Sequence, residues 1–128
     1  MSYYFSKTIS APFDDAVERA STALAGQGFG ILTQIDMSAT LKFKLGVEFR
    51  PYIVLGACSP GFAHKALEAE DKIGTMLPCN VIVQELAPGK VEIAAVDPVA
   101  SMQAITNPLL REIAGLVQTK LKAAIESI

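Results

Sequence analysis

Two hydrophobic periods alternate along the chain, and they predict the order of its helices and strands. Tyr3 to Ile9 is short and rich in aromatic residues, as expected of a strand. Ala11-Pro12 then opens a helix of period 3.6 that ends near Gly26 and Gly28. The apolar face of this helix is predicted to hold Phe13, Val17, Ala20 and Leu24.

From Phe29 the period changes to two, which predicts a strand with two different faces. One face would carry Phe29, Ile31, Thr33 and Ile35, and the other Gly30, Leu32 and Gln34. Ser38 belongs to the residue types that cap helices, so we expect a short helix from there to Gly46. The strand predicted from Tyr52 to Cys58 is apolar on both faces, which is typical of a central strand.

The second half of the chain predicts two helices and a hairpin. Ser59-Pro60 begins a helix whose apolar face is Phe62, Ala63, Ala66 and Leu67. Cys79 to Glu85 and Val91 to Val96 are strands joined through a short turn with Pro and Gly, which favours an antiparallel hairpin. Asn107-Pro108 begins the last helix, with Leu110, Ile113, Val117, Leu121 and Ile125 expected to face inward.

This order, β-α-β-α-β-α-β-β-α in a single domain of residues 1–128, predicts an α+β fold. The hairpin favours a mostly antiparallel or mixed sheet covered by helices. A doubly wound parallel sheet is the alternative, and it would place a Gly-rich turn between a strand and a helix. No such phosphate-binding motif is present, because the run from Gly26 to Gly30 leads from a helix into a strand.

Composition and charge narrow the possible partners and compartments. The chain has 128 residues, of which 51% are hydrophobic, and a formal net charge of −2, which gives no reason to expect nucleic acid. Lys42, Lys44 and Arg50 read as solvated charges or, alternatively, as a site for an anionic ligand. No segment approaches the roughly 18 apolar residues of a membrane span, and no signal peptide is visible. We therefore expect no membrane partner and a cytoplasmic protein with reduced cysteines.

Three residues that favour helix caps each precede a proline, at Ser59-Pro60, Asp97-Pro98 and Asn107-Pro108. The side-chain oxygen can accept a free backbone N–H, while proline supplies a helical φ. The simplest interpretation makes all three of them helix starts. The alternative keeps Asp97 as an acid at a strand end near a cleft.

The two cysteines are candidates for chemistry. Cys58 ends a strand just before a helix start, where the helix dipole favours a thiolate. Cys79 opens the next strand, and if the two strands are antiparallel neighbours the two sulfurs could approach each other. The competing interpretation is that both are buried core residues, as free cysteines often are. No spacing matches a metal site, so any metal or cofactor stays unknown.

His64 is the only histidine of the chain. It lies on the helix after Cys58, with Glu68 one turn later, so a surface ion pair is the ordinary expectation. The sharper hypothesis makes His64 a base for Cys58 in a nucleophilic site.

Three blocks of sequence resemble a known family. Leu55 to Pro60 (LGACSP), Leu77 to Val81 (LPCNV) and Val96 to Pro98 (VDP) are similar, in this order, to the signature blocks of the domain-of-unknown-function family DUF302. The stretches from Gly28 to Thr33 and from Leu45 to Tyr52 are also similar to it. Ser59 stands where asparagine is expected, and both residues serve as caps.

The resemblance implies a compact α+β unit of the fold class that includes TATA-binding-protein-like domains, and it implies homodimers. It also implies a candidate site of Cys58, Cys79, Asn80 and Asp97, to which His64 is added by proximity; no catalytic residue can be assigned. Three functions stay open. The first is a homodimer that binds a small ligand or a metal in a pocket containing the thiols. The second is a thiol redox enzyme or sensor using Cys58 and Cys79, and the third is an interaction module without catalysis.

Overall fold

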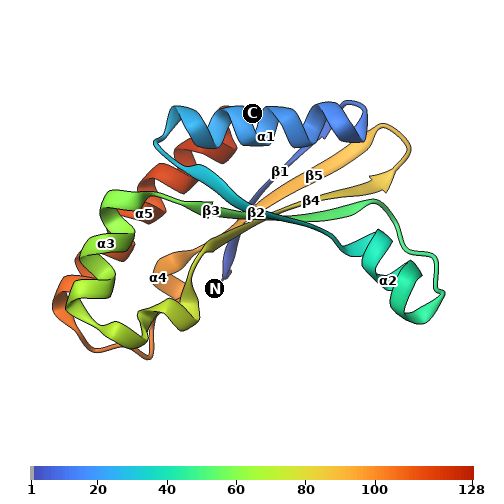
Figure 1. Cartoon of the computed structure of the whole chain (residues 1–128). Coiled ribbons are helices and arrows are strands. Elements are labelled where there is room, and N and C mark those ends of the chain that lie inside the picture. The colour runs from blue at the N-terminus through green and yellow to red at the C-terminus, as the bar shows by residue number, and fades with distance from the viewer. Residues whose placement is uncertain (1) are drawn as a thin grey trace.

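The computed structural model describes residues 2–128 and has two layers, a twisted sheet and a layer of helices on one of its faces (Figure 1). The strands are β1 (Tyr4–Ser10), β2 (Gly30–Asp36), β3 (Tyr52–Cys58), β4 (Cys79–Ala87) and β5 (Lys90–Val96). They form one five-stranded sheet in the order β1-β5-β4-β3-β2. Every neighbouring pair is antiparallel, so the α+β prediction is confirmed and the doubly wound parallel alternative is wrong.

The helices are α1 (Phe13–Gly26), α2 (Met37–Leu45), α3 (Pro60–Ala69), α4 (Pro98–Ser101) and α5 (Pro108–Glu126), with a 3-10 helix η1 (Asp71–Met76) before β4. The predicted element order is confirmed, and α4 and η1 are added to it. Both are too short to show a hydrophobic period, which is why the pattern did not separate them from loops. None of the helices within residues 2–128 is both long and apolar enough to cross a membrane.

One face of the sheet is covered by α1 and α5 and forms the hydrophobic core. The strands contribute Ile53, Leu55, Ala57, Val81, Val83, Val91, Ile93 and Ala95 to it, all of them buried. The strand register aligns Leu55 with Val81 and Val81 with Ala95, so these side chains leave the sheet on the same side. The residues of α5 predicted to face inward are all buried, and those of α1 are buried or packed against the core.

The opposite face of the sheet carries no such helical cover along the described chain. We call it the open face and define it by Tyr4, Tyr52, Val54, Gly56, Asn80, Ile82, Gln84, Glu92, Ala94 and Val96, which the register places together. Figure 1 shows α2 on this side, away from α1 and beyond the end of the sheet. Most of these side chains therefore lie outside the core, although Val96 packs against it.

The predicted faces of β2 are wrong in part, because the strand contains a bulge. Ile31 pairs with Ala57 of the covered face, whereas Thr33 pairs with Gly56 of the open face. An extra residue, Leu32, lies between them and is 64% exposed. A bulge reverses the alternation of side chains beyond it. Phe29 and Ile31 therefore face the helices, but Thr33 and Ile35 do not.

The predicted cap of α2 is also wrong, by two positions. Asp36, and not Ser38, accepts the backbone N–H of Ala39 at 2.9 Å, while the Ser38 hydroxyl donates to the same carboxylate oxygen at 2.9 Å. These two hydrogen bonds lower the pKa of Asp36, since they stabilise its charged form. Gly46 ends the helix in the left-handed conformation, with φ 68°, as the sequence predicted.

Candidate functional site

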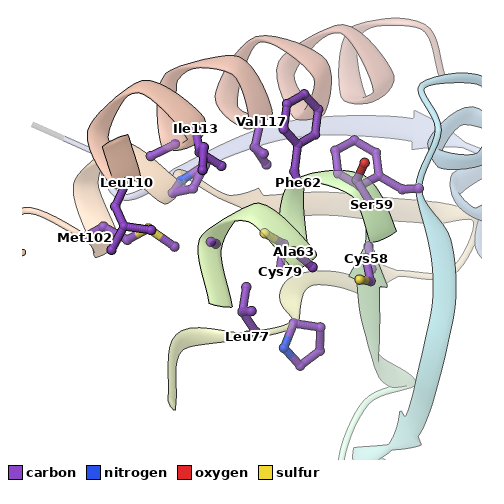
Figure 2. A pocket seen from close by; sticks show the side chains of 16 residues that line it. Cys58, Ser59, Phe62, Ala63, Leu77, Cys79, Met102, Leu110, Ile113 and Val117 are labelled. Carbon is purple, nitrogen blue, oxygen red and sulfur yellow. The ribbon is translucent and has the colours of Figure 1, made fainter. Parts of the chain in front are cut away.

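A small apolar cavity lies between the helix layer and the ends of β3 and β4. Its volume is about 40 Å³, and its walls come from α3, α5, the start of α4 and the two strand ends. Figure 2 shows Phe62, Ile113 and Val117 on one side of it, with the two cysteines on the other. Nearly all of its lining is apolar, so the cavity suits a hydrophobic ligand or stays dry.

The chain builds this cavity by turning sharply at two adjacent strand ends. β3 ends at Cys58 and α3 begins at Pro60, while β4 begins at Cys79 directly after Pro78. Gly56 allows this arrangement because it has no side chain. A Cβ at Gly56 would lie 2.2 Å from Thr33 Oγ1 and 2.8 Å from Pro78 Cγ, so any larger residue would force Thr33 and Pro78 to shift.

Cys58 and Cys79 both line the cavity, as the sequence suggested, and neither is in a disulfide. They lie on antiparallel neighbouring strands, but the residue opposite Cys79 is Ala57. Cys58 is therefore one register step away, and consecutive side chains leave a strand on opposite faces. Figure 2 shows the two sulfur atoms pointing in different directions.

The Cys79 thiol is held in its neutral form. The residue is 9% exposed, and burial, together with the nearby Cys58, raises the pKa of Cys79 from 9.0 to about 11. Loss of solvation disfavours the thiolate because an apolar cavity cannot stabilise its charge. At neutral pH Cys79 is thus a neutral wall of the cavity, which agrees with the core interpretation of this residue.

Asn80 and Asp97 lie at the same end of the sheet but do not line the cavity. Asn80 follows Cys79 along β4 and is exposed on the open face. The Asp97 carboxylate accepts the backbone N–H groups of Val99 at 3.0 Å and of Ala100 at 3.4 Å. It also accepts the Gln118 side-chain amide at 3.0 Å, so it caps α4 and ties it to α5.

Of the other two cap–proline pairs, one behaves as predicted. Asn107 accepts the backbone N–H of Leu109 at 3.1 Å and caps α5. Ser59 occupies the N-cap of α3 but makes no side-chain cap hydrogen bond, and its side chain instead lines the cavity. The helix starts are correct in all three cases, whereas the capping mechanism fails at Ser59.

His64 lies outside the cavity. Its side chain is 76% exposed, and its Nε2 atom lies 3.4 Å from Glu68 Oε1. Within residues 2–128 no hydrogen bond joins His64 to Cys58, so the geometry agrees with the surface-pair interpretation. The helix turns His64 outward because its neighbours Phe62, Ala63 and Ala66 form the inward face.

Two of the three basic residues considered for an anion site, Lys42 and Arg50, have other partners. Lys42 pairs with Glu48. The Nε atom of Arg50 donates to Gln84 Oε1 at 2.7 Å, and its guanidinium lies over the rings of Phe49 and Tyr52. The described residues contain no cluster of three or more metal-ligating side chains.

Sequence reasoning missed the walls of the cavity contributed by the C-terminal third of the chain. Met102 follows α4, and Ala114 lies on α5 beside the predicted inward residues. A neighbouring surface hollow of about 290 Å³ shares five lining residues with the cavity: Leu77, Pro78, Cys79, Pro98 and Met102. The helical period of α5 could have pointed to Ala114, but nothing local indicates that Met102 reaches Cys79.

Comparison with known proteins agrees with the resemblance. No functionally curated protein matches the chain. Its structure is similar to the crystal structure of an uncharacterised conserved DUF302 protein from Bacillus stearothermophilus, with a TM-score of 0.89 and 27% sequence identity over 98% of each chain. The sequence profile described as "Domain of unknown function DUF302" matches residues 5–128, and the chain belongs to the DUF302 family.

Proposed function

We propose that this protein binds a small apolar ligand in the cavity between α3, α5 and the ends of β3 and β4. The observation that carries the proposal is an apolar cavity of about 40 Å³ beside two free thiols. Such a space accommodates roughly a few non-hydrogen atoms, such as the end of a short alkyl chain. Dispersion and release of apolar surface from water would supply the affinity.

Two side chains in the walls of the cavity could move and make space for a larger ligand. Phe62 and Met102 are only partly buried, and methionine changes shape at little cost because its side chain is unbranched. Met102 lies between the cavity and the neighbouring surface hollow, and the two spaces share five lining residues. Movement of Met102 would join them and give a ligand a route inward.

A small apolar ligand agrees better with the site than a metal or a redox reaction does. The described residues place no third metal-ligating side chain beside the two thiols, and the raised pKa of Cys79 makes it a poor resolving thiol at neutral pH. Cys58, which is half-buried, is the thiol available to a ligand with a soft or electrophilic end. We therefore rank a thiol redox function below the binding of a small apolar ligand.

Titration of the protein with benzene, followed by ¹H–¹⁵N NMR, tests the proposal. Benzene is larger than the cavity as it stands and would enter as Met102 moves to join the cavity with the neighbouring hollow. It should then shift the resonances of α3, α5 and the β3 and β4 ends. Ala114→Leu should abolish these shifts by filling the cavity, whereas Ala25→Leu, on the exposed end of α1, should leave them unchanged. Shifts that persist in Ala114→Leu, or none in the natural protein, would overturn the proposal.

We also propose that the protein acts as a homodimer in the cytoplasm. The support for assembly is its exposed apolar surface, above all Phe43, which is 88% exposed, and Leu45, which is 69% exposed. The support for a reducing compartment is that both cysteines are free. Sedimentation equilibrium tests the first statement, and cell fractionation tests the second.

A further inference from the structure

The α2 arm, which we define as residues 37–51, exposes apolar side chains that have no packing partner in the core of the monomer. The helix at its start has no buried residue. Its apolar side chains alternate with charged or small ones and are exposed by 88% at Phe43, 69% at Leu45, 44% at Val47 and 40% at Phe49. A nine-residue helix is marginal in water without packing against another surface.

The open face offers a matching depression. A concavity of about 410 Å³ lies over β4 and β5 and is lined by apolar and aromatic groups of Tyr4, Tyr52, Ile82, Ala94 and Val96. Its volume exceeds that of a phenylalanine side chain several times, so an aromatic knob and part of its helix would fit. Ala94 is 8% exposed, which leaves a shallow floor between larger neighbours.

Charges are also complementary between the two surfaces. The last turn of α2 carries Lys44 and also Lys42, which pairs with Glu48 of its own chain, whereas the concavity is lined by Glu92. Gln84 donates to Glu92 Oε1 at 2.8 Å and accepts from Arg50, which holds the carboxylate in place at the rim. A lysine approaching with α2 would meet an ordered acceptor, and such pairs favour one orientation of docking.

We propose that the open face is an interface between two copies of this chain, in which Phe43 of each copy enters the concavity on the other. This interface rests on the homodimer proposed above, and it specifies which surfaces of the two copies meet and how. The arrangement is isologous, because each copy has both the knob and the hole. Figure 1 shows α2 projecting on the open side of the sheet, where it can reach a facing molecule.

The available area is sufficient for a stable dimer. Strands 4.8 Å apart and about seven residues long give an open face of roughly 550 Å², and one side of α2 adds roughly 150 Å². Specific dimers bury about 600–1,000 Å² per partner. The open face and α2 together reach this range, whereas either surface alone does not.

Sedimentation equilibrium of three proteins tests the interface. The natural chain should be a dimer, and Phe43→Glu should raise the dissociation constant at least roughly 30-fold, as expected for a central anchor residue. Leu116→Glu is the matched control, because Leu116 is 49% exposed but lies on α5, in the helix layer. It should leave the dimer intact.

Replacing Phe43 with the photoreactive analogue p-benzoylphenylalanine locates the contact. In a mixture of ¹⁴N and ¹⁵N chains, cross-links should join different chains and map to β4 and β5 residues of the concavity. A monomeric natural chain would overturn both the homodimer and this interface. A dimer that survives Phe43→Glu and cross-links elsewhere would overturn the interface alone, and neither result depends on the ligand cavity.

Discussion

The two faces of the sheet differ in both composition and surroundings. The covered face is sealed by α1 and α5, and its strand residues are buried, mostly completely. The open face also carries Val54, Ile82, Ala94 and Val96, but beside them stand Gln84, Glu92 and Asn80. The first face stabilises the monomer, and the second is the surface that we propose recognises another copy of the chain.

Alanine variants of Ile93 and Ile82, which lie on adjacent strands and opposite faces of the sheet, compare the contributions of the two faces to the unfolding free energy. Ile93→Ala should cost about 2–5 kcal/mol of unfolding free energy, because it leaves a cavity in a fully buried site. Ile82→Ala, on the half-buried open face, should cost about 1 kcal/mol at concentrations where the chain is monomeric. Urea unfolding at low and high protein concentration checks both. Equal losses at low concentration would show that the open face is part of the monomer's core.

The pH dependence of the unfolding free energy tests whether the Cys79 thiol is excluded from solvent. Its folded pKa of about 11 lies above the ordinary value of 9.0, so the folded state holds its proton more tightly. This contribution is present below pH 9 and is lost as pH rises from 9.0 to about 11, a decrease of about 2–3 kcal/mol in unfolding free energy. Cys79→Ala should remove that slope, whereas Cys58→Ala should keep it. An unchanged slope in Cys79→Ala would mean that Cys79 is solvated.

Gly56→Ala tests the tight contact at the edge between cavity and open face. The new Cβ would clash with Thr33 Oγ1 and with the Pro78 ring, so the variant should lose about 1–3 kcal/mol. Gly115→Ala is its control, since a Cβ there meets no atom within 4 Å and alanine favours a helix. It should gain about 0.5–1 kcal/mol. Thermal unfolding checks both, and a neutral Gly56→Ala would show that Pro78 moves freely.

The smallest expected change in stability is that of Asp97→Ala, and this variant tests whether Asp97 is only a helix cap or also part of the ligand site. Asp97→Ala removes the cap of α4 and the hydrogen bond to Gln118, which should cost about 1 kcal/mol. Benzene-induced shifts of the cavity residues should be preserved, because Asp97 does not line the cavity. Asp14→Ala, in the first turn of α1, is the comparison for loss of a helix-start charge alone. Loss of benzene binding in Asp97→Ala with intact stability would restore Asp97 as a site residue.

Most of the fold could be predicted because its signals are local. The inward face of α5, the hairpin after β4 and the glycine end of α2 each follow from a repeat or a turn residue. The failures occurred where one residue shifts the pattern. Leu32 is inserted in β2 and reverses its faces, and Asp36 takes the cap from Ser38 because its carboxylate reaches the Ala39 N–H. The two cysteines were correctly placed at neighbouring strand ends, but their register could not be known.

The sequence by itself determined the α+β class, the order of the long elements, the family and the two thiols, because periodicity, caps and motifs are properties of short segments. Only the tertiary structure decided that Met102 and α5 close a cavity against Cys79 and that His64 points outward. It also decided that, within residues 2–128, no helix covers the second face of the sheet. These features depend on contacts between residues far apart in the chain. Register, burial and solvation arise from such contacts, and they decide which of the candidate residues form a site.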